Sequence, residues 1–157
     1  YIRQRALPQL RERGYANYTL VTKDIGTKVG VCGLYVRPDL ELIDLGYALH
    51  PDHEGQGYAQ ESSRRIMQAA KECFGQVKLS AITHGENTAS IKVLEALGFA
   101  HLGQKTVAGY DGPSELAGQL AAIFSRKSGT QSISNPSMCP AMLAAMVVGS
   151  KLMPARL

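Results

Sequence analysis

The residues best suited to chemistry form a glycine-containing turn and, further along the chain, a polar helix start. The turn is Glu-Gly-Gln-Gly-Tyr-Ala at residues 54–59, between a β-like run and a stretch with helical periodicity. A strand that leads through glycines into a helix directs several backbone N–H groups at one point, where the helix dipole favours an anion. The turn therefore predicts a site for the phosphates of a nucleotide-like cofactor.

Two common nucleotide-binding motifs do not fit this turn. A dinucleotide-binding turn needs G-x-G-x-x-G or a final alanine, whereas Gln60 holds the last position and the next strand ends without a clear ribose-binding acid. A P-loop ends in Gly-Lys-Ser/Thr, which the segment lacks. Because Gly-x-Gly alone is a weak signal, its interpretation depends on a second motif.

The second motif is Asn-Thr-Ala-Ser-Ile-Lys-Val-Leu-Glu-Ala-Leu-Gly-Phe at residues 87–99. Asn87 is a good N-cap for a helix, and Gly98 followed by Phe99 fits a left-handed C-terminal stop with its apolar contact. Ser90 lies one helical turn beyond Asn87 on a similar face. Taken alone, Asn87 would most often serve only as a cap, and Ser90 could equally be an ordinary first-turn residue.

Together the two motifs resemble those of the GNAT superfamily of acetyl-CoA-dependent N-acyltransferases. The first motif of that family, Arg/Gln-x-x-Gly-x-Gly/Ala, is matched at Gly57 and Ala59. Asn87, Ser90 and the Leu-Gly-Phe at residues 97–99 match its second motif. The flanking Gly-Tyr and Gln-Glu pairs are similar to the version in RimJ/RimL-type ribosomal-protein N-acetyltransferases.

The resemblance covers about residues 20–105 and implies a fold, a cosubstrate and a set of contacts. The expected fold class is α/β (α+β), with a mixed, largely antiparallel twisted sheet flanked by helices. The expected cosubstrate is acetyl-CoA. Its expected binding residues are Ala48, Leu49 and His50 at a strand end, Gly55, Gln56, Gly57, Tyr58 and Ala59 in the turn, and Asn87 and Ser90 on the later helix.

The same resemblance implies catalytic roles. Backbone N–H groups near residues 48–50 would polarise the acetyl carbonyl. The amide of Asn87 would bond to the pantetheine arm, and the Ser90 hydroxyl would protonate the departing thiolate. Asp44 stands in a strand where the resembling proteins often carry an acid, and it would take the amine proton directly or through water. His50 and Glu41 are alternative bases, and a merely solvated Asp44 is the competing interpretation.

Glu54 departs from the family pattern, which has Arg or Gln at this position. A carboxylate beside a pyrophosphate is repelled by about 1 kcal/mol at solvent-like dielectric and by several in a drier site. Either the side chain points away, or a cation such as His53, Lys71 or a helix arginine offsets it, or cofactor binding is weakened.

Composition agrees with one small globular domain. A chain of 157 residues with 45% apolar and 19% charged residues can bury a sizeable core. The net charge of +4 comes largely from an arginine cluster, interpreted as a solvated helix face. An anionic cofactor is compatible with this charge, whereas nucleic-acid binding is not required. The clustered residues are Arg3, Arg5, Arg11 and Arg13.

Metal and membrane sites are not expected. The three cysteines are odd in number and lack a CxxC pair, which argues against a disulfide framework or zinc site. His50, His53 and His84 lack a convincing fourth ligand. Without a signal peptide or a long apolar span, the expected location is cytoplasmic.

The periodicity predicts the elements that position these residues. A basic helix at residues 2–13 is interrupted by Pro8, and the helix from Tyr58 presents one apolar face. That face carries Ile66, Ala70 and Phe74. The expected strands are 18–21 and 29–36, which form a hairpin, then 42–49, 77–83, 101–107 and a final one within 120–126.

Residues 1–127 are expected to form the GNAT-like domain, and residues 128–157 a linker-like segment and an apolar tail of unknown role. Relatives begin with a strand and a helix that form part of the acceptor site, and we expect both to be missing here. Two function classes remain: an N-acetyltransferase for a protein N-terminus or small amine, and a non-catalytic acyl-CoA-binding module. A homodimer is a further expectation.

Overall fold

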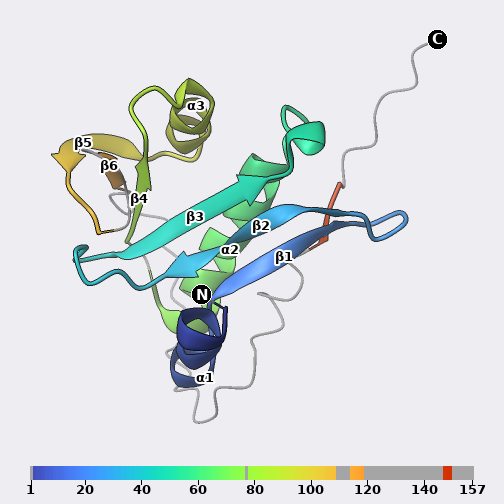
Figure 1. Ribbon diagram of the computed structural model, residues 1–157, viewed down its shortest axis with the longest axis horizontal. Coiled ribbons are helices and arrows are strands. Elements are labelled where there is room, and N and C mark those ends of the chain that lie inside the picture. Colours follow the sequence, from blue (N-terminus) through green and yellow to red (C-terminus); the bar gives the residue numbers. More distant parts are fainter. Residues whose placement is uncertain (1, 77, 109–113, 119–146, 150–157) are drawn as a thin grey trace.

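A single sheet with helices packed against it makes up the computed structural model, which describes residues 2–76, 78–108, 114–118 and 147–149. The strand order is β5-β6-β4-β3-β2-β1-β7 (Figure 1). Among the described strands, β3/β4 and β1/β7 pair in parallel and the other pairs are antiparallel, so the predicted mixed, largely antiparallel sheet is confirmed. The strands are β1 Asn17–Thr22, β2 Lys28–Tyr35, β3 Ile43–Leu49, β4 Leu79–Thr83, β5 Ala100–Lys105, β6 Ser114–Gly118 and β7 Val147–Val148. The helices are η1 Ile2–Ala6, α1 Leu7–Arg13, η2 Pro51–His53, α2 Tyr58–Phe74 and α3 Thr88–Ala96.

The core lies between the sheet and α2, which crosses behind β2 and β3 in Figure 1. Leu20, Leu34 and Leu45 from three neighbouring strands are fully buried and belong to one cluster with Ile66 of α2. The predicted face of α2 is confirmed, because Ile66 and Ala70 are buried and Phe74 packs against the same cluster. Burial of these side chains fixes how β3 is presented to the site.

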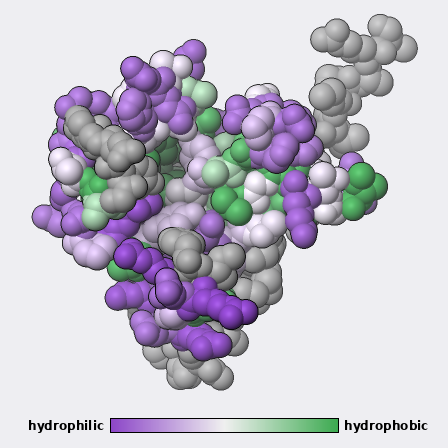
Figure 2. Space-filling view, in the orientation of Figure 1, coloured by the Kyte–Doolittle hydropathy of each residue, from purple (hydrophilic) through white to green (hydrophobic). Residues whose placement is uncertain are grey.

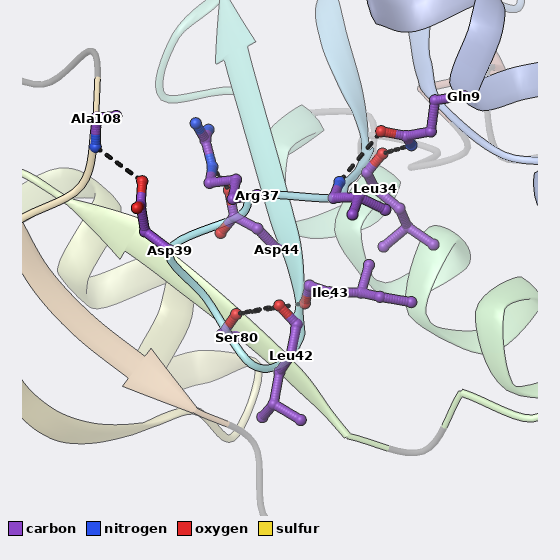
Figure 3. Close-up of polar contacts among 10 residues, drawn as sticks. Gln9, Leu34, Arg37, Asp39, Leu42, Ile43, Asp44, Ser80 and Ala108 are labelled. Carbon is purple, nitrogen blue, oxygen red and sulfur yellow. Dashed lines mark hydrogen bonds and ion pairs between the residues drawn. The ribbon is translucent and has the colours of Figure 1, made fainter.

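The predicted interruption at Pro8 marks the change from η1 to α1, where a proline is tolerated because first-turn N–H groups have no helical partner. Gln9 then fastens α1 to the end of β2 (Figure 3). Its Nε2 donates to the carbonyl of Leu34 at 2.8 Å, and its Oε1 accepts from the N–H of Val36 at 3.1 Å. Hydrophilic side chains gather over α1 in the lower part of Figure 2.

The structure differs from the expected elements at the far edge of the sheet. Strand β4 begins at Leu79 and β5 ends at Lys105, each two residues inside the predicted range. Strand β6 was not predicted, and it lies between β4 and β5 with antiparallel pairing to both. Its Ser-Glu-Leu-Ala-Gly sequence has little strand character, so only sheet pairing identifies it. The strand expected within residues 120–126 lies outside the described residues.

A short piece of the predicted C-terminal tail packs on the domain. In β7, Val148 is fully buried and accepts a hydrogen bond from the Lys23 N–H at 3.1 Å. The N–H of Gly149 donates to Glu61 Oε2 of α2 at 3.0 Å. Cys32 is buried and free, whereas Cys73 is disulfide-bonded, which the cysteine pattern did not predict.

Candidate active site

The two central parallel strands share only a short contact and then separate. Strands β3 and β4 pair at Ile43↔Leu79 and Asp44↔Ser80, although β3 runs on to Leu49. The Ser80 hydroxyl reinforces the closed end by donating to the carbonyls of Leu42 and Ile43 at 3.2 and 3.4 Å (Figure 3). Beyond Asp44 the edges of both strands are open to a ligand.

A cavity of about 580 Å³ occupies the space where these strands part. It brings together Asp44 and Ala48 of β3 with Asn87 and Ser90 of the α3 start, which are four of the predicted site residues. Five further polar side chains lie in its walls, and the motifs did not place them there. These are Tyr35, Arg37, Tyr47, Thr83 and His84.

Asp44 lies at the closed end of the cavity with a side chain that is 1% exposed. Its Oδ2 accepts a hydrogen bond from Arg37 Nε at 2.5 Å (Figure 3). Burial raises the pKa of Asp44 to about 6, against the opposing effect of the Arg37 cation. Oδ1 has no hydrogen-bond partner of normal geometry among the described residues, although the Ile82 backbone is close enough to lower the pKa slightly. The carboxylate therefore has one oxygen whose hydrogen-bonding capacity is not filled by the described residues.

The two alternative bases lie elsewhere. Glu41 is exposed at the surface. His50 is also exposed, and its Nδ1 accepts from the Asp52 N–H at 3.4 Å. Of the three groups considered, Asp44 is the one that lines the cavity.

Strand pairing decides which backbone N–H groups of β3 face the cavity. The His50 N–H donates to the Val29 carbonyl of β2 at 2.9 Å. Because hydrogen-bonded pairs alternate along an antiparallel ladder, the N–H of Ala48 also faces β2. Those of Tyr47 and Leu49 face the side where β4 departs. Within the predicted residues 48–50, Leu49 is thus the one whose N–H points away from β2, whereas Ala48 is the one that lines the cavity.

Asn87 and Ser90 begin α3 as the sequence predicted. Asn87 Oδ1 caps the helix by accepting from the Ser90 N–H at 3.0 Å. The predicted stop is confirmed, with Gly98 at φ +83° and the Phe99 N–H bonded to the Leu94 carbonyl. The helix therefore holds both polar side chains at the cavity wall.

Tyr47 bridges the cavity from β3 to this helix start. Its hydroxyl donates to the Ser90 carbonyl at 3.4 Å, and burial raises the pKa of the phenol. The residue stands in the Gly-Tyr pair that flanked the family match, which was the one sequence feature that pointed to it.

The glycine turn lies outside the cavity walls, at the start of α2. Gly55 and Gly57 have φ values of +70° and +85°, which favour glycine. A Cβ at either position would meet no atom within 4 Å, so the space beside the turn is open. Outside the hydrogen bonds of α2 itself, none of the described backbone hydrogen bonds is donated by residues 55–60, and the first N–H groups of a helix lack a partner within it. These free donors at a helix start suit a phosphate, and Glu54 beside them is exposed.

Comparison with known proteins identifies the family. Residues 1–100 match the acetyltransferase (GNAT) domain. The chain belongs to the GNAT acetyltransferase family. The uncharacterized protein YkkB of Bacillus subtilis strain 168 is 31% identical over 127 residues, which are 76% of this chain and 67% of YkkB. Across its curated relatives, the chain spans about half to two thirds of their own length.

Solved GNAT structures share the fold. An acetyltransferase from Agrobacterium tumefaciens superposes with a TM-score of 0.65 at 22% identity, covering 73% of this chain and 66% of that protein. A ribosomal-protein-S5-alanine acetyltransferase from Vibrio fischeri gives 0.63 at 17% identity, covering 76% and 69%. The mixed sheet described above is therefore that of the GNAT fold.

The described residues contain neither a candidate membrane span nor a candidate metal site. No helix in this part of the chain is long and apolar enough to cross a membrane. No group of three or more His, Cys, Asp or Glu side chains in the same part is placed to hold a metal ion.

Proposed function

We propose that this chain transfers an acetyl group from acetyl-CoA to a primary amine. The observation that carries the proposal is the cavity between β3 and β4, which has the buried Asp44 at its closed end and Asn87 and Ser90 on its opposite wall. Family membership supplies the reaction class. The cavity adds a base, a hydrogen-bonding amide and a hydroxyl within one space.

The residues fit acetyl-CoA as the donor. The free N–H groups of residues 55–60 suit its pyrophosphate, and the open space at Gly55 and Gly57 allows close approach. The Asn87 amide still has donor hydrogens when its Oδ1 caps α3, and these suit an amide carbonyl of the pantetheine arm. When bound, acetyl-CoA supplies a thioester with a good leaving group.

Each protein group then has one task. The Leu49 N–H polarises the acetyl carbonyl from the open edge of β3. Asp44 accepts the proton that the attacking amine must lose, and its raised pKa makes it a stronger base than an ordinary carboxylate. The Ser90 hydroxyl passes a proton to the leaving sulfur and regains one from solvent, while Asp44 releases the amine proton to solvent. The Tyr47 hydroxyl is a second donor that lines the cavity.

The acceptor is proposed as a protein N-terminus or a small amine. An alanine of a ribosomal protein is named as the target of the Vibrio fischeri neighbour. The RimJ/RimL-like flanks of the glycine turn favour the same acceptor class. We further propose that the protein is cytoplasmic and forms a homodimer.

The test measures thiol release from acetyl-CoA with a panel of N-terminal peptides, amino acids, polyamines and amine antibiotics. Calorimetry of acetyl-CoA binding runs in parallel. Amine-dependent thiol release that disappears in Asp44→Asn is the expected result. Tight binding without release for any amine would instead identify a non-catalytic acyl-CoA-binding module.

A further inference from the structure

Tyr35 and Gly46 face each other on the cavity side of the β2–β3 ladder. In the register of this pair, Tyr35 stands directly opposite Asp44, and Gly46 is its diagonal neighbour. A Cβ built on Gly46 would lie 2.7 Å from Cε2 and 3.2 Å from Cδ2 of the Tyr35 ring. The ring therefore lies in the space that any larger residue at position 46 would fill.

Arg37 rests on the same ring. Its Cζ is 5.4 Å from the centre of the Tyr35 ring, within the range of a cation–π contact. From that position Nε donates to Asp44 Oδ2 at 2.5 Å, as Figure 3 shows from the side of the β2–β3 loop. The guanidinium is thus held by the ring and by the carboxylate.

We propose that Gly46 and Tyr35 form a seat for Arg37, and that the seated Arg37 keeps the buried Asp44 ionised and aimed into the cavity. Tyr35, Arg37 and Gly46 are then positioning residues that act through Asp44. The functional meaning of the seat rests on the proposed role of Asp44 as the base.

Burial and the Arg37 cation have opposite effects on the ionisation of Asp44. A carboxyl that is 1% exposed favours its neutral form, and a neutral carboxyl cannot accept the amine proton. A cation at hydrogen-bond distance opposes this effect. A mobile Arg37 would increase the fraction of Asp44 that is protonated at neutral pH, so the position of the guanidinium matters as well as its presence.

The other ionisable groups in the cavity do not replace Arg37. Among the described residues, the ionisable side chains that line the cavity with Asp44 are Tyr35, Arg37, Tyr47 and His84. The Tyr47 hydroxyl bonds to the Ser90 carbonyl, away from Asp44. His84 is exposed, and its Nδ1 accepts from the Glu86 N–H at 3.3 Å. No second contact between Asp44 and a cation is found among the described residues.

The experiment titrates Asp44 directly by NMR of protein labelled with ¹³Cγ-aspartate, with Asp44→Asn to assign the resonance. Arg37→Gln should raise the pKa of Asp44 by roughly one to three pH units. Tyr35→Leu and Gly46→Ala should each raise it by about half a unit, because each loosens the seat without removing the charge. Tyr35→Phe keeps the ring, and Arg11→Gln removes one exposed charge from α1, so both should leave the titration unchanged.

Titrations of Tyr35→Leu and Gly46→Ala that match the wild type would overturn the seat, even if Arg37→Gln does not fold. Arg37→Lys keeps a charge but loses the planar guanidinium, and an unchanged titration there would also count against it. These NMR titrations of Asp44 need neither an acceptor amine nor acetyl-CoA. A protein inactive on every amine would therefore contradict the proposed function and leave the seat intact.

Discussion

Asp44 and Ser80 form the last pair that β3 and β4 share, and the cavity begins where this pair ends. The Ser80 hydroxyl holds the carbonyls of Leu42 and Ile43, so the closed end is fastened by a side chain as well as by the ladder. One strand position thus contributes both the end of the sheet contact and the buried carboxylate. This geometry makes Asp44 the first residue to test.

Replacing Asp44 by Asn should lower kcat by about a hundredfold to ten-thousandfold, the range for loss of a general base. In the wild type, kcat/KM should fall as the pH drops below about 6, since protonation of Asp44 removes the base. A pH–rate series with the best amine of the panel checks both statements. An acid limb that persists unchanged in Asp44→Asn would assign the titration to another group.

The same carboxyl should make stability depend on pH. Burial raises the pKa of Asp44 from 3.8 to about 6, so the folded state binds this proton more tightly than the unfolded state does. Its stabilising contribution is complete below pH 3.8 and is lost as the pH rises through about 6. Relative to Asp44→Asn, the wild type should lose about 3 kcal/mol of unfolding free energy across this window. Urea unfolding at several pH values measures this difference in unfolding free energy. If Asp44 were wholly solvated, the difference would not change with pH.

The sequence could predict the parts of the fold that have a local cause. The β1–β2 hairpin, the apolar face of α2 and the Asn87 cap follow from periodicity and turn chemistry, and all are confirmed. Strand β6 could not be predicted, because its five residues owe their conformation to pairing with β4 and β5. Tertiary contacts override weak local preference there.

The same division holds for the site. Asp44, Asn87 and Ser90 were predicted from motifs, and the structure places all three on one cavity. Arg37 and Tyr35 belong to no motif, and their importance depends on a cross-strand register that sequence does not display. The choice of Leu49 over His50 likewise depends on which N–H groups β2 already uses.

Substitutions at Asn87 and Ser90 should have separable effects on acetyl-CoA binding and on turnover. Ser90→Ala should lower kcat more than acetyl-CoA affinity if the hydroxyl protonates the leaving sulfur. Asn87→Ala should weaken acetyl-CoA binding and also cost about 1 kcal/mol of stability, because the cap to the Ser90 N–H is lost. Asn87→Ser is the matched control, since serine restores the cap without the amide. Wild-type kinetics in Ser90→Ala, with a loss in Tyr47→Phe, would move the acid role to Tyr47.

The phosphate site should depend on Gly57. Gly57→Asp places a charge and a side chain beside the free N–H groups and should abolish acetyl-CoA binding in calorimetry. Because Gly57 has φ +85°, backbone strain accompanies this change. Gly26→Asp is the matched control, because Gly26 lies at φ +71° in the β1–β2 turn, away from the glycine turn at residues 54–59. It introduces the same charge and a similar strain, and it should leave acetyl-CoA affinity unchanged. Equal affinity in a folded Gly57→Asp would rule out this turn as the phosphate site.

Glu54 most clearly separates this chain from the family pattern, and its effect on binding can be measured with a single substitution. The residue is exposed and directly precedes the turn whose N–H groups are proposed to hold the pyrophosphate. Glu54→Gln removes the negative charge and restores a residue that the pattern allows. If the carboxylate faces the phosphates, acetyl-CoA should bind about fivefold to tenfold more tightly, which corresponds to roughly 1 kcal/mol. The gain should shrink as salt rises, since screening weakens repulsion between exposed charges. Glu86→Gln, which removes an exposed charge from the loop before α3, serves as the matched control. An affinity that stays equal or falls at every salt concentration would show that Glu54 points away from the phosphates, so that the departure from the motif carries no penalty for binding.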